Sequence, residues 1–278
     1  MSKNNTPSLY YIGFLLIFLL VFSLVCIYFP LDATFLTGNL FHLYILGINL
    51  LLLFDYKLPN KKAIGNAMLL TYLVALTEID RHLIWEFYRF NWWSLMPILL
   101  TFLASLNFFR LKEVYPESDL VFISHGKNKA WLISVLIGIL CGLLGAGINF
   151  IIKIKYLAPT PNWSIHALIL SLDSAIFEEI ALRTSFYTLA LHLFKGNLTN
   201  KYANYLTWIG MILPFAIDRQ TNVFMSEGLV AGVISSLILS LVFYFIFAFL
   251  QRKRDILSAM VAHGLVSAIY YMFFQVNF

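Results

Sequence analysis

The sequence predicts an all-α fold, a polytopic membrane helix bundle with about nine transmembrane helices. Of the 278 residues, 60% are hydrophobic and only 12% are charged, whereas a soluble domain of ordinary composition carries about 25% charged residues. Apolar runs long enough to cross about 30 Å of hydrocarbon recur from one end of the chain to the other. Together these observations exclude a soluble globular domain and indicate a multi-pass membrane protein.

Nine apolar runs are the expected spans, and eight is the nearest alternative because the seventh run is short and contains Pro214. The first run follows Lys3 without a small-residue cleavage site behind it, which is typical of a retained span and not of a signal peptide. The expected spans are residues 9–29, 38–54, 63–79, 92–109, 130–152, 165–194, 203–217, 228–250 and 256–276.

The basic residues predict the orientation of the bundle. With the N-terminus in the cytoplasm, thirteen lysines and arginines fall in cytoplasmic loops and five in external loops, while Arg183 lies within a span. Cytoplasmic loops carry the excess of basic residues in membrane proteins, so we expect a cytoplasmic N-terminus. Because the basic residues are spread over short loops, topology explains the net charge of +5 and we discount nucleic acid as a partner.

The longest polar connection, residues 110–129, divides the chain into two parts. We expect N-terminal transmembrane helices in residues 1–129 and a second helical core in residues 130–278. In the first part, the cluster Glu78-Ile-Asp80-Arg81-His82 has mixed signs and is expected to form a solvated turn at the membrane interface.

Small residues recur at four-residue spacing in the second part. Such stripes let two helices approach closely, so the helices that carry them are expected in the interior of the bundle. The two stripes are Gly138 and Gly142, and Gly228, Gly232, Ser236 and Ser240.

The sixth run contains residues 174–185, in which Glu178, Glu179 and Arg183 interrupt an otherwise apolar segment. A charge near the bilayer centre costs at least about 2.5–3.5 kcal/mol, so these groups need internal partners or a water-filled cavity. In an α-helix Glu179 and Arg183 share a face, while Glu178 points about 100° away. We therefore expect an ion pair between Glu179 and Arg183, with Glu178 available for chemistry or for another partner.

Two further polar features lie in or next to apolar runs. Asp218 and Arg219 follow the short seventh run, and His263 and Ser267 lie four apart on one face of the last run. Ionisable residues inside a membrane mark functional sites by default. A carboxylate and a histidine in a dehydrated cavity can activate and orient water for attack on an amide. The sequence thus predicts a hydrolytic site, with Asp218 as a weaker candidate.

These residues resemble the motifs of the CPBP family, the CAAX-prenyl-protease-2-like and bacteriocin-processing (Abi) intramembrane proteins. The motifs are E-E-x-x-x-R from Glu178, a polar position about 40 residues later, and H-x-x-x-S from His263, and the resemblance covers roughly residues 130–276. It implies that Glu178 activates the hydrolytic water, that Glu179 and Arg183 support it, and that His263 and Ser267 hold the water and the oxyanion.

The resemblance also implies a location and a cofactor state. It places the chain in a bacterial plasma membrane, acting on a peptide or membrane protein. No tightly bound metal or other cofactor is implied, although family members are often labelled metalloproteases.

Two positions depart from the family pattern, so more than one function stays open. The second motif, F-x-x-x-H, reads Phe215-Ala-Ile-Asp-Arg219 here, and the third motif ends in Ser267 instead of asparagine or aspartate. An arginine cannot act as a base. The chain is therefore either a peptidase for a membrane-associated or prenylated peptide or precursor, or an inactive relative that binds a membrane partner in bacteriocin immunity or regulation. A transporter that uses Glu178 and Asp218 is a third alternative.

Overall fold

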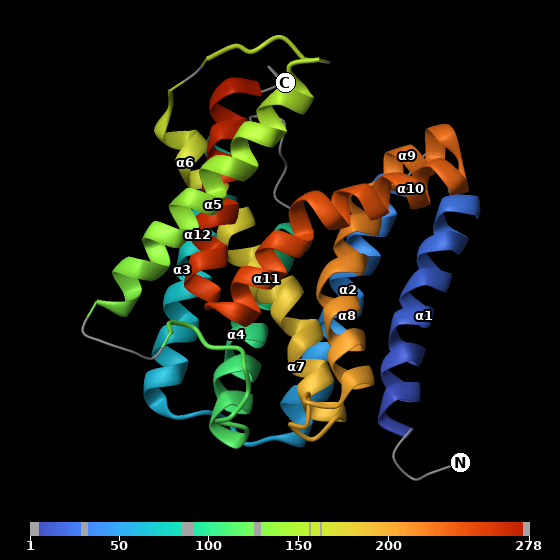
Figure 1. Cartoon of the computed structure of the whole chain (residues 1–278), viewed down its shortest axis with the longest axis vertical. Coiled ribbons are helices and arrows are strands. Elements are labelled where there is room, and N and C mark those ends of the chain that lie inside the picture. Colours follow the sequence, from blue (N-terminus) through green and yellow to red (C-terminus); the bar gives the residue numbers. More distant parts are fainter. Residues whose placement is uncertain are drawn as a thin grey trace. The chain divides into compact units, whose positions relative to one another are not determined.

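The computed structural model describes residues 6–28, 33–84, 92–124, 129–155, 157–161 and 163–274, and every regular element within them is a helix (Figure 1). The prediction of an all-α fold is therefore confirmed for this part of the chain. Segment η1 is a 3₁₀ helix, and η2 and η3 are π-helical. The elements are α1 (Thr6–Tyr28), α2 (Ala33–Asp55), α3 (Lys61–Ile84), η1 (Trp92–Leu95), α4 (Met96–Val114), α5 (Ala130–Lys153), α6 (Ile165–Leu172), η2 (Asp173–Arg183), α7 (Thr184–Leu193), α8 (Lys201–Asp218), α9 (Thr221–Glu227), α10 (Leu229–Leu239), η3 (Ser240–Tyr244), α11 (Phe245–Lys253) and α12 (Ile256–Phe274).

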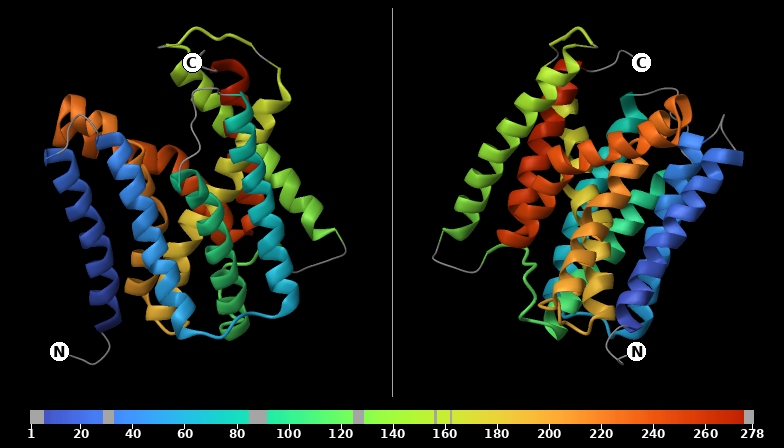
Figure 2. Two further views of the ribbon diagram at one scale, coloured as in Figure 1. Left: turned by 180° about the vertical axis from the view of Figure 1, so that it is seen from behind. Right: turned by 45° about the vertical axis from the view of Figure 1, so that its right-hand side comes forward.

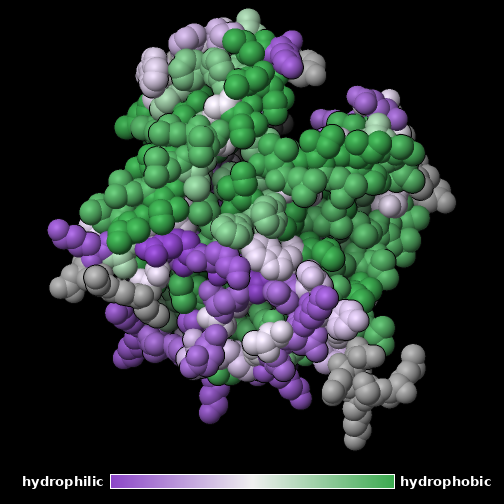
Figure 3. Space-filling model, viewed as in Figure 1, coloured by the Kyte–Doolittle hydropathy of each residue, from purple (hydrophilic) through white to green (hydrophobic). Residues whose placement is uncertain are grey.

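Among the described residues, 6 helices are long and apolar enough to cross a membrane. They are α1, α3, η1 with α4, α5, the continuous rod of α10, η3 and α11, and α12. The other three expected runs are helical too, but none of them contains a described helix that is both long enough and apolar enough to cross a membrane. The described apolar part of α2 is too short, and the run around η2 carries four charged residues. Hydrophobic residues cover most of the face seen in Figure 3, as expected of a helical membrane bundle.

The chain folds into two compact units that each take segments from both sides of residue 129. The expected division at residues 129 and 130 follows chain order and stays a prediction. The first unit comprises Met1–Ile64, Leu103–Ser118 and Leu182–Ala248, and the second comprises Gly65–Phe102, Asp119–Ala181 and Phe249–Phe278.

In the first unit, aromatic side chains join α1 and α2 to α7 and α8. The ring centroids of Phe18 and Phe41 lie 5.2 Å apart, and Phe41 meets Phe215 edge to face at 5.7 Å. Such ring pairs add about 0.5–1.5 kcal/mol beyond the area that they bury. Tyr11 of α1 donates a hydrogen bond of 3.1 Å to the carbonyl of Phe186 in α7. Figure 2 shows α1 and α2 as neighbouring rods.

Two glycines shape the turn between α9 and α10, also in the first unit. Gly228 has a φ of 88°, a left-handed conformation that glycine adopts without a steric penalty. Gly232 faces the ring of Phe224, and a Cβ at Gly232 would lie 2.3 Å from that ring. The expected packing role is thus confirmed for Gly232.

In the second unit, α5 and α12 lie side by side along their lengths (Figure 1). The contact runs over the small-residue stripe, because a Cβ at Gly138 would lie 2.7 Å from the carbonyl oxygen of Ser258 and 2.7 Å from the Cβ of Val261. A Cβ at Gly142 would lie 2.9 Å from the carbonyl oxygen of Ala262. The expectation that this spacing serves a close helix contact is therefore confirmed. The expected interior position of the two helices is wrong, because only 22% of the span in α5 and 33% of the span from Leu229 to Lys253 are buried.

Asp255 fixes the start of α12. Its Oδ1 accepts the backbone N–H of Ser258 at 2.8 Å, as a helix cap does, and its Oδ2 accepts the backbone N–H of Ser124 at 3.0 Å. The backbone N–H groups of residues 256 and 257 donate to the carbonyls of residues 121 and 122. The loop before α5 is thereby tied to the corner between α11 and α12.

We expect Gly138→Ala to lower the free energy of unfolding by about 1–3 kcal/mol, because the added methyl group overpacks the α5–α12 contact. The midpoint of thermal denaturation in detergent micelles should fall by roughly 2–12 °C. Gly147→Ala is the matched control, since a Cβ at this position of the same helix would meet open space beyond the backbone of its own helix. Equal midpoints for the two variants would contradict the packing role.

Candidate active site

Glu178 and Glu179 lie in η2, a π-helical segment of 11 residues between α6 and α7. The sequence predicted a continuous α-helix here, with 100° between successive residues. The i→i+5 hydrogen bonds of a π-helix widen each turn, so the angle predicted from α-helical geometry is wrong for this segment. Both side chains are buried, with 3% and 0% of their surface exposed. π-helical turns occur frequently at functional sites.

His263 of α12 lies against both carboxylates. Its Nδ1 is 2.6 Å from Oε1 of Glu179, and its Nε2 is 3.7 Å from Oε2 of Glu178. The first distance is a short hydrogen bond and the second is too long for one. The close approach of α12 to η2 depends on Gly264, where a Cβ would lie 2.9 Å from the Cβ of Ala175. The structure thus brings together three of the residues that the sequence singled out.

Gln251, near the end of α11, is a site residue that the sequence analysis missed. It is fully buried, and its Nε2 donates to Oε2 of Glu179 at 2.7 Å and to the Glu179 carbonyl at 3.0 Å. Each oxygen of the Glu179 carboxylate therefore has a partner. The signal in the sequence is faint, because Gln251 directly precedes three basic residues and looks like the polar end of an apolar run.

Two serines lie on the elements that carry the site. The hydroxyl of Ser174 donates to Oε1 of Glu178 at 3.4 Å, at the long limit of hydrogen bonding. Ser267, predicted as a site residue, lies one helical turn beyond His263 on α12 and is partly buried. Its predicted part in holding an oxyanion stays a prediction.

Arg183 ends η2 and is fully buried among aromatic rings. Its Nε donates to the carbonyl of Met211 at 3.2 Å, and its guanidinium carbon lies 5.1 Å from the ring centroid of Phe215. The rings of Tyr244 and Phe247 lie at 5.8 Å. Aromatic faces stabilise a desolvated guanidinium by about 2 kcal/mol or more. The expected ion pair between Glu179 and Arg183 stays a prediction.

Asp218 and Arg219 lie at the end of α8, where Asp218 is partly buried and Arg219 is exposed. The carbonyl of Asp218 accepts the hydroxyl of Thr221 at 2.8 Å. Both residues belong to the first unit, whereas the two glutamates and His263 belong to the second. The weaker assignment of Asp218 to the site stays a prediction.

The expectation of a solvated turn around Glu78 is wrong for the described side chains. Glu78 and Asp80 are buried, with 4% and 8% of their surface exposed. Oδ1 of Asp80 lies 2.9 Å from Nδ1 of His166, which joins α3 to α6 within the second unit. The side chains of Arg81 and His82 lie outside the described residues.

A second polar cluster joins the ends of α2, α4 and α7 in the first unit. Nε2 of His192 lies 3.2 Å from Oδ2 of Asp55, and its Nδ1 lies 2.8 Å from the hydroxyl of Tyr56. The guanidinium of Arg110, which is buried, lies over the Tyr56 ring at 5.2 Å. Burial raises the pKa of Tyr56, so its phenol stays protonated at neutral pH. The cluster holds three helix ends together.

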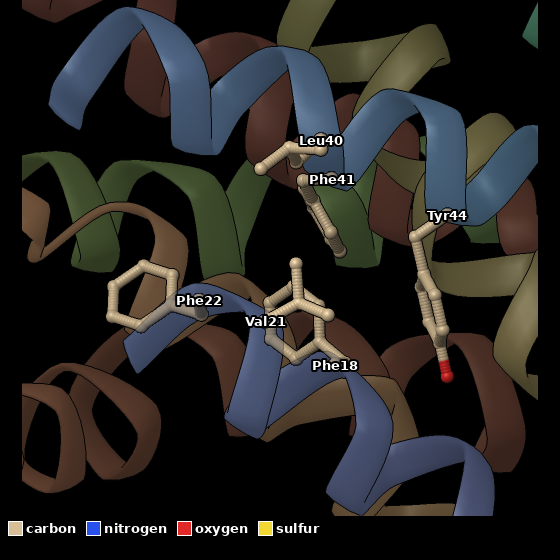
Figure 4. Close-up of a pocket in the computed structure, with 6 residues that line it drawn as sticks. All are labelled: Phe18, Val21, Phe22, Leu40, Phe41 and Tyr44. Atoms are coloured by element: carbon tan, nitrogen blue, oxygen red, sulfur yellow. The ribbon is translucent and has the colours of Figure 1, made fainter. Parts of the chain in front are cut away.

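An apolar pocket opens between α1 and α2, also in the first unit (Figure 4). Tyr44 donates its hydroxyl to the carbonyl of Phe14, so the pocket offers hydrocarbon surface and no acid–base pair. Its lining consists of Phe18, Val21, Phe22, Leu40, Phe41 and Tyr44.

Within the described residues, no group of three or more His, Cys, Asp or Glu side chains is placed to hold a metal ion. Comparisons of the chain with protein-family models, with curated proteins and with solved structures found no match. The resemblance to the CPBP family therefore rests on the motif residues alone.

We expect Arg183→Lys to lower the free energy of unfolding by about 2–4 kcal/mol, because an ammonium group cannot both lie flat on the rings and reach the Met211 carbonyl. Urea denaturation in mild detergent measures the loss. Arg219→Lys is the matched control, because Arg219 is exposed and an exposed substitution changes stability by less than about 0.5 kcal/mol. A loss of equal size in both variants would contradict the role of the aromatic rings.

Proposed function

We propose that the protein is an intramembrane peptidase in which Glu178 activates a water molecule for attack on a peptide bond. The observation that carries this proposal is the position of His263 against two buried carboxylates, at 2.6 Å from Glu179 and 3.7 Å from Glu178. Burying an ionisable triad in an apolar bundle is expensive, and such groups are kept where they perform chemistry. The resemblance to the CPBP family points to the same residues.

The two carboxylates have different parts in this proposal. Glu179 holds the imidazole of His263 through Nδ1, as a carboxylate orients the histidine of a catalytic triad. A neutral imidazole that donates from Nδ1 presents the lone pair of Nε2 on the side of Glu178. A water molecule beside the line from Nε2 to Oε2 of Glu178 can then donate one hydrogen bond to each atom.

Hydrolysis follows from that arrangement without any further co-reactant. Glu178 takes one proton from the water while the oxygen of that water attacks the carbonyl carbon of the peptide bond. The negative charge then moves to the carbonyl oxygen. Collapse of the tetrahedral intermediate breaks the C–N bond, and Glu178 returns the proton to the leaving amine. The products are a carboxylic acid and an amine. The Ser267 hydroxyl is the proposed donor to the developing oxyanion.

The substrate class follows from the setting of the site. A buried site in a helical bundle receives a segment that is itself held at the membrane, so we propose a membrane-associated or prenylated peptide or precursor. We propose that all nine expected runs cross the bilayer with the N-terminus in the cytoplasm. In this orientation thirteen basic residues lie on the cytoplasmic side, where membrane proteins carry their excess of basic residues. A bacterial plasma membrane is the proposed location.

We expect Glu178→Gln to reduce peptide cleavage by about 10²–10⁴-fold, because an amide cannot accept the proton of the water. The purified protein in phospholipid vesicles is incubated with farnesylated and unmodified membrane-anchored peptides, and products are identified by mass spectrometry. Glu117→Gln is the matched control, since Glu117 is exposed in a loop. Cleavage by wild type that is unchanged in Glu178→Gln would overturn the mechanism.

A second candidate function is favoured by one observation, the arginine at position 219 in place of the motif histidine. In this alternative the chain is an inactive relative that binds a membrane partner in bacteriocin immunity or regulation. Binding then depends on the shape of the helical surface and not on the acid–base groups.

For the second candidate we expect Glu178→Gln to leave the cellular phenotype intact, whereas Gly232→Leu abolishes it. The reason is steric, because a side chain at Gly232 would clash with the Phe224 ring and separate α9 from α10. The measurement is survival of cells under bacteriocin challenge at matched membrane levels of each variant. Loss of protection in Glu178→Gln alone would favour the peptidase.

A further inference from the structure

Gln251 makes its two hydrogen bonds to Glu179 and none to Glu178 or His263, yet its amide is placed to orient His263 through Glu179. We propose that Gln251 is a positioning residue, which fixes Glu179 as a hydrogen-bond acceptor and thereby sets the orientation and tautomer of His263. This inference rests on the proposed peptidase role of Glu178 and His263, and it adds a residue that the family motifs do not contain.

The hydrogen bonds of Glu179 carry the first step. Oε2 accepts from Nε2 of Gln251 at 2.7 Å, and Oε1 lies 2.6 Å from Nδ1 of His263. An amide N–H can only donate, so it favours an acceptor at Oε2 and an unprotonated carboxylate. Nδ1 of His263 must then donate to Oε1. The proton of a neutral imidazole therefore lies on Nδ1, and Nε2 is left as an acceptor facing Glu178.

The orientation of the Gln251 amide follows from the same atoms. With the amide reversed, its oxygen would face a carboxylate oxygen and the carbonyl of Glu179, which are all acceptors. In the observed orientation Oε1 of Gln251 is buried and has no hydrogen-bond partner among the described residues. A buried acceptor in that state destabilises the fold, because it has lost its hydrogen bonds to water. The fold accepts an unpaired Oε1 of Gln251, and in return the amide N–H donates to Glu179. This is typical of a residue that serves a site and not stability.

The corner between α11 and α12 holds Gln251 in place. Arg252 donates to Oδ2 of Asp119 from Nε at 2.9 Å and from Nη2 at 2.6 Å. Three residues later, Asp255 accepts from Ser124 and caps α12, the helix that carries His263. One anchored corner thus determines the positions of both the amide and the imidazole. A hydrogen bond from a rigid scaffold gives the geometric precision that a positioned imidazole needs.

The test replaces the amide donor in two ways that keep the size of the side chain. Gln251→Met removes the N–H, and Gln251→Glu places a second carboxyl group against Glu179. Gln220→Met is the matched control, since Gln220 accepts a hydrogen bond from Ser235 in the first unit. The proteins are labelled with ¹⁵N-histidine, and spectra are recorded in detergent micelles at mildly alkaline pH.

The first readout is the tautomer of His263, which needs no peptidase activity. Its nitrogen signals are assigned by their loss in His263→Asn. We expect protonated Nδ1 and unprotonated Nε2 in wild type and in Gln220→Met, and a mixture of tautomers in Gln251→Met and Gln251→Glu. A wild-type imidazole with a proton on Nε2, or Gln251 variants with the wild-type signals, would overturn the proposal. If Gln251→Met does not fold, the nitrogen signals of His263 in Gln251→Glu decide whether Gln251 sets the tautomer.

The second readout is peptide cleavage in the vesicle assay. We expect Gln251→Met to lower kcat by about 10–100-fold with KM unchanged, as is typical when an outer-shell partner is lost. Cleavage at the wild-type rate would overturn the proposal. If wild type cleaves no peptide, the proposed peptidase function fails, while the tautomer signals still decide whether Gln251 positions His263.

Discussion

The hydrogen bond between Glu179 and His263 is the interaction on which the rest of the candidate site depends. Both groups are buried in a bundle whose other side chains are mostly hydrocarbon, so each must find its partner inside the protein. The Glu179 carboxylate has two partners, His263 from α12 and Gln251 from α11. The helical packing therefore has to bring α11 and α12 close to η2. The contact at Gly264 does so for α12, where a Cβ would lie 2.9 Å from the Cβ of Ala175 in η2.

The π-helical form of η2 fits this requirement. A wider turn changes the direction in which Glu178 and Glu179 point relative to an α-helix, and it does so over the residues that are charged. The neighbouring segments α6 and α7 are α-helical and mostly apolar. Within this run, only η2 departs from α-helical geometry. It is also the part of the run whose charged side chains point to partners inside the protein and not to lipid.

Much of the fold could be predicted from the sequence, and less of the site. Long apolar runs and the spacing of Gly138 and Gly142 predicted helices and a close contact, because both depend on patterns local to one segment. The cluster of Glu178, Glu179 and His263 was also found, since ionisable groups stand out in apolar runs. Gln251 was not found, because its role arises from a contact with a residue 72 positions away. The burial of Asp80 was missed for the same reason, as its partner His166 lies 86 positions away.

Glu178 and Glu179 are adjacent and chemically identical, but they have different neighbours, and the proposed mechanism gives them different roles. Glu179 has a close partner at each carboxylate oxygen, His263 at 2.6 Å and Gln251 at 2.7 Å. Glu178 has longer contacts, 3.4 Å to the hydroxyl of Ser174 and 3.7 Å to His263. In the proposed mechanism Glu178 takes a proton from water and Glu179 holds the imidazole of His263, and a carboxylate that holds an imidazole needs short hydrogen bonds that fix its position. The short contacts of Glu179 therefore support the holding role that the proposed mechanism gives to it. The amide of Gln251 donates to Glu179 and not to Glu178. Gln251 would therefore have to move if the two glutamates exchanged these roles.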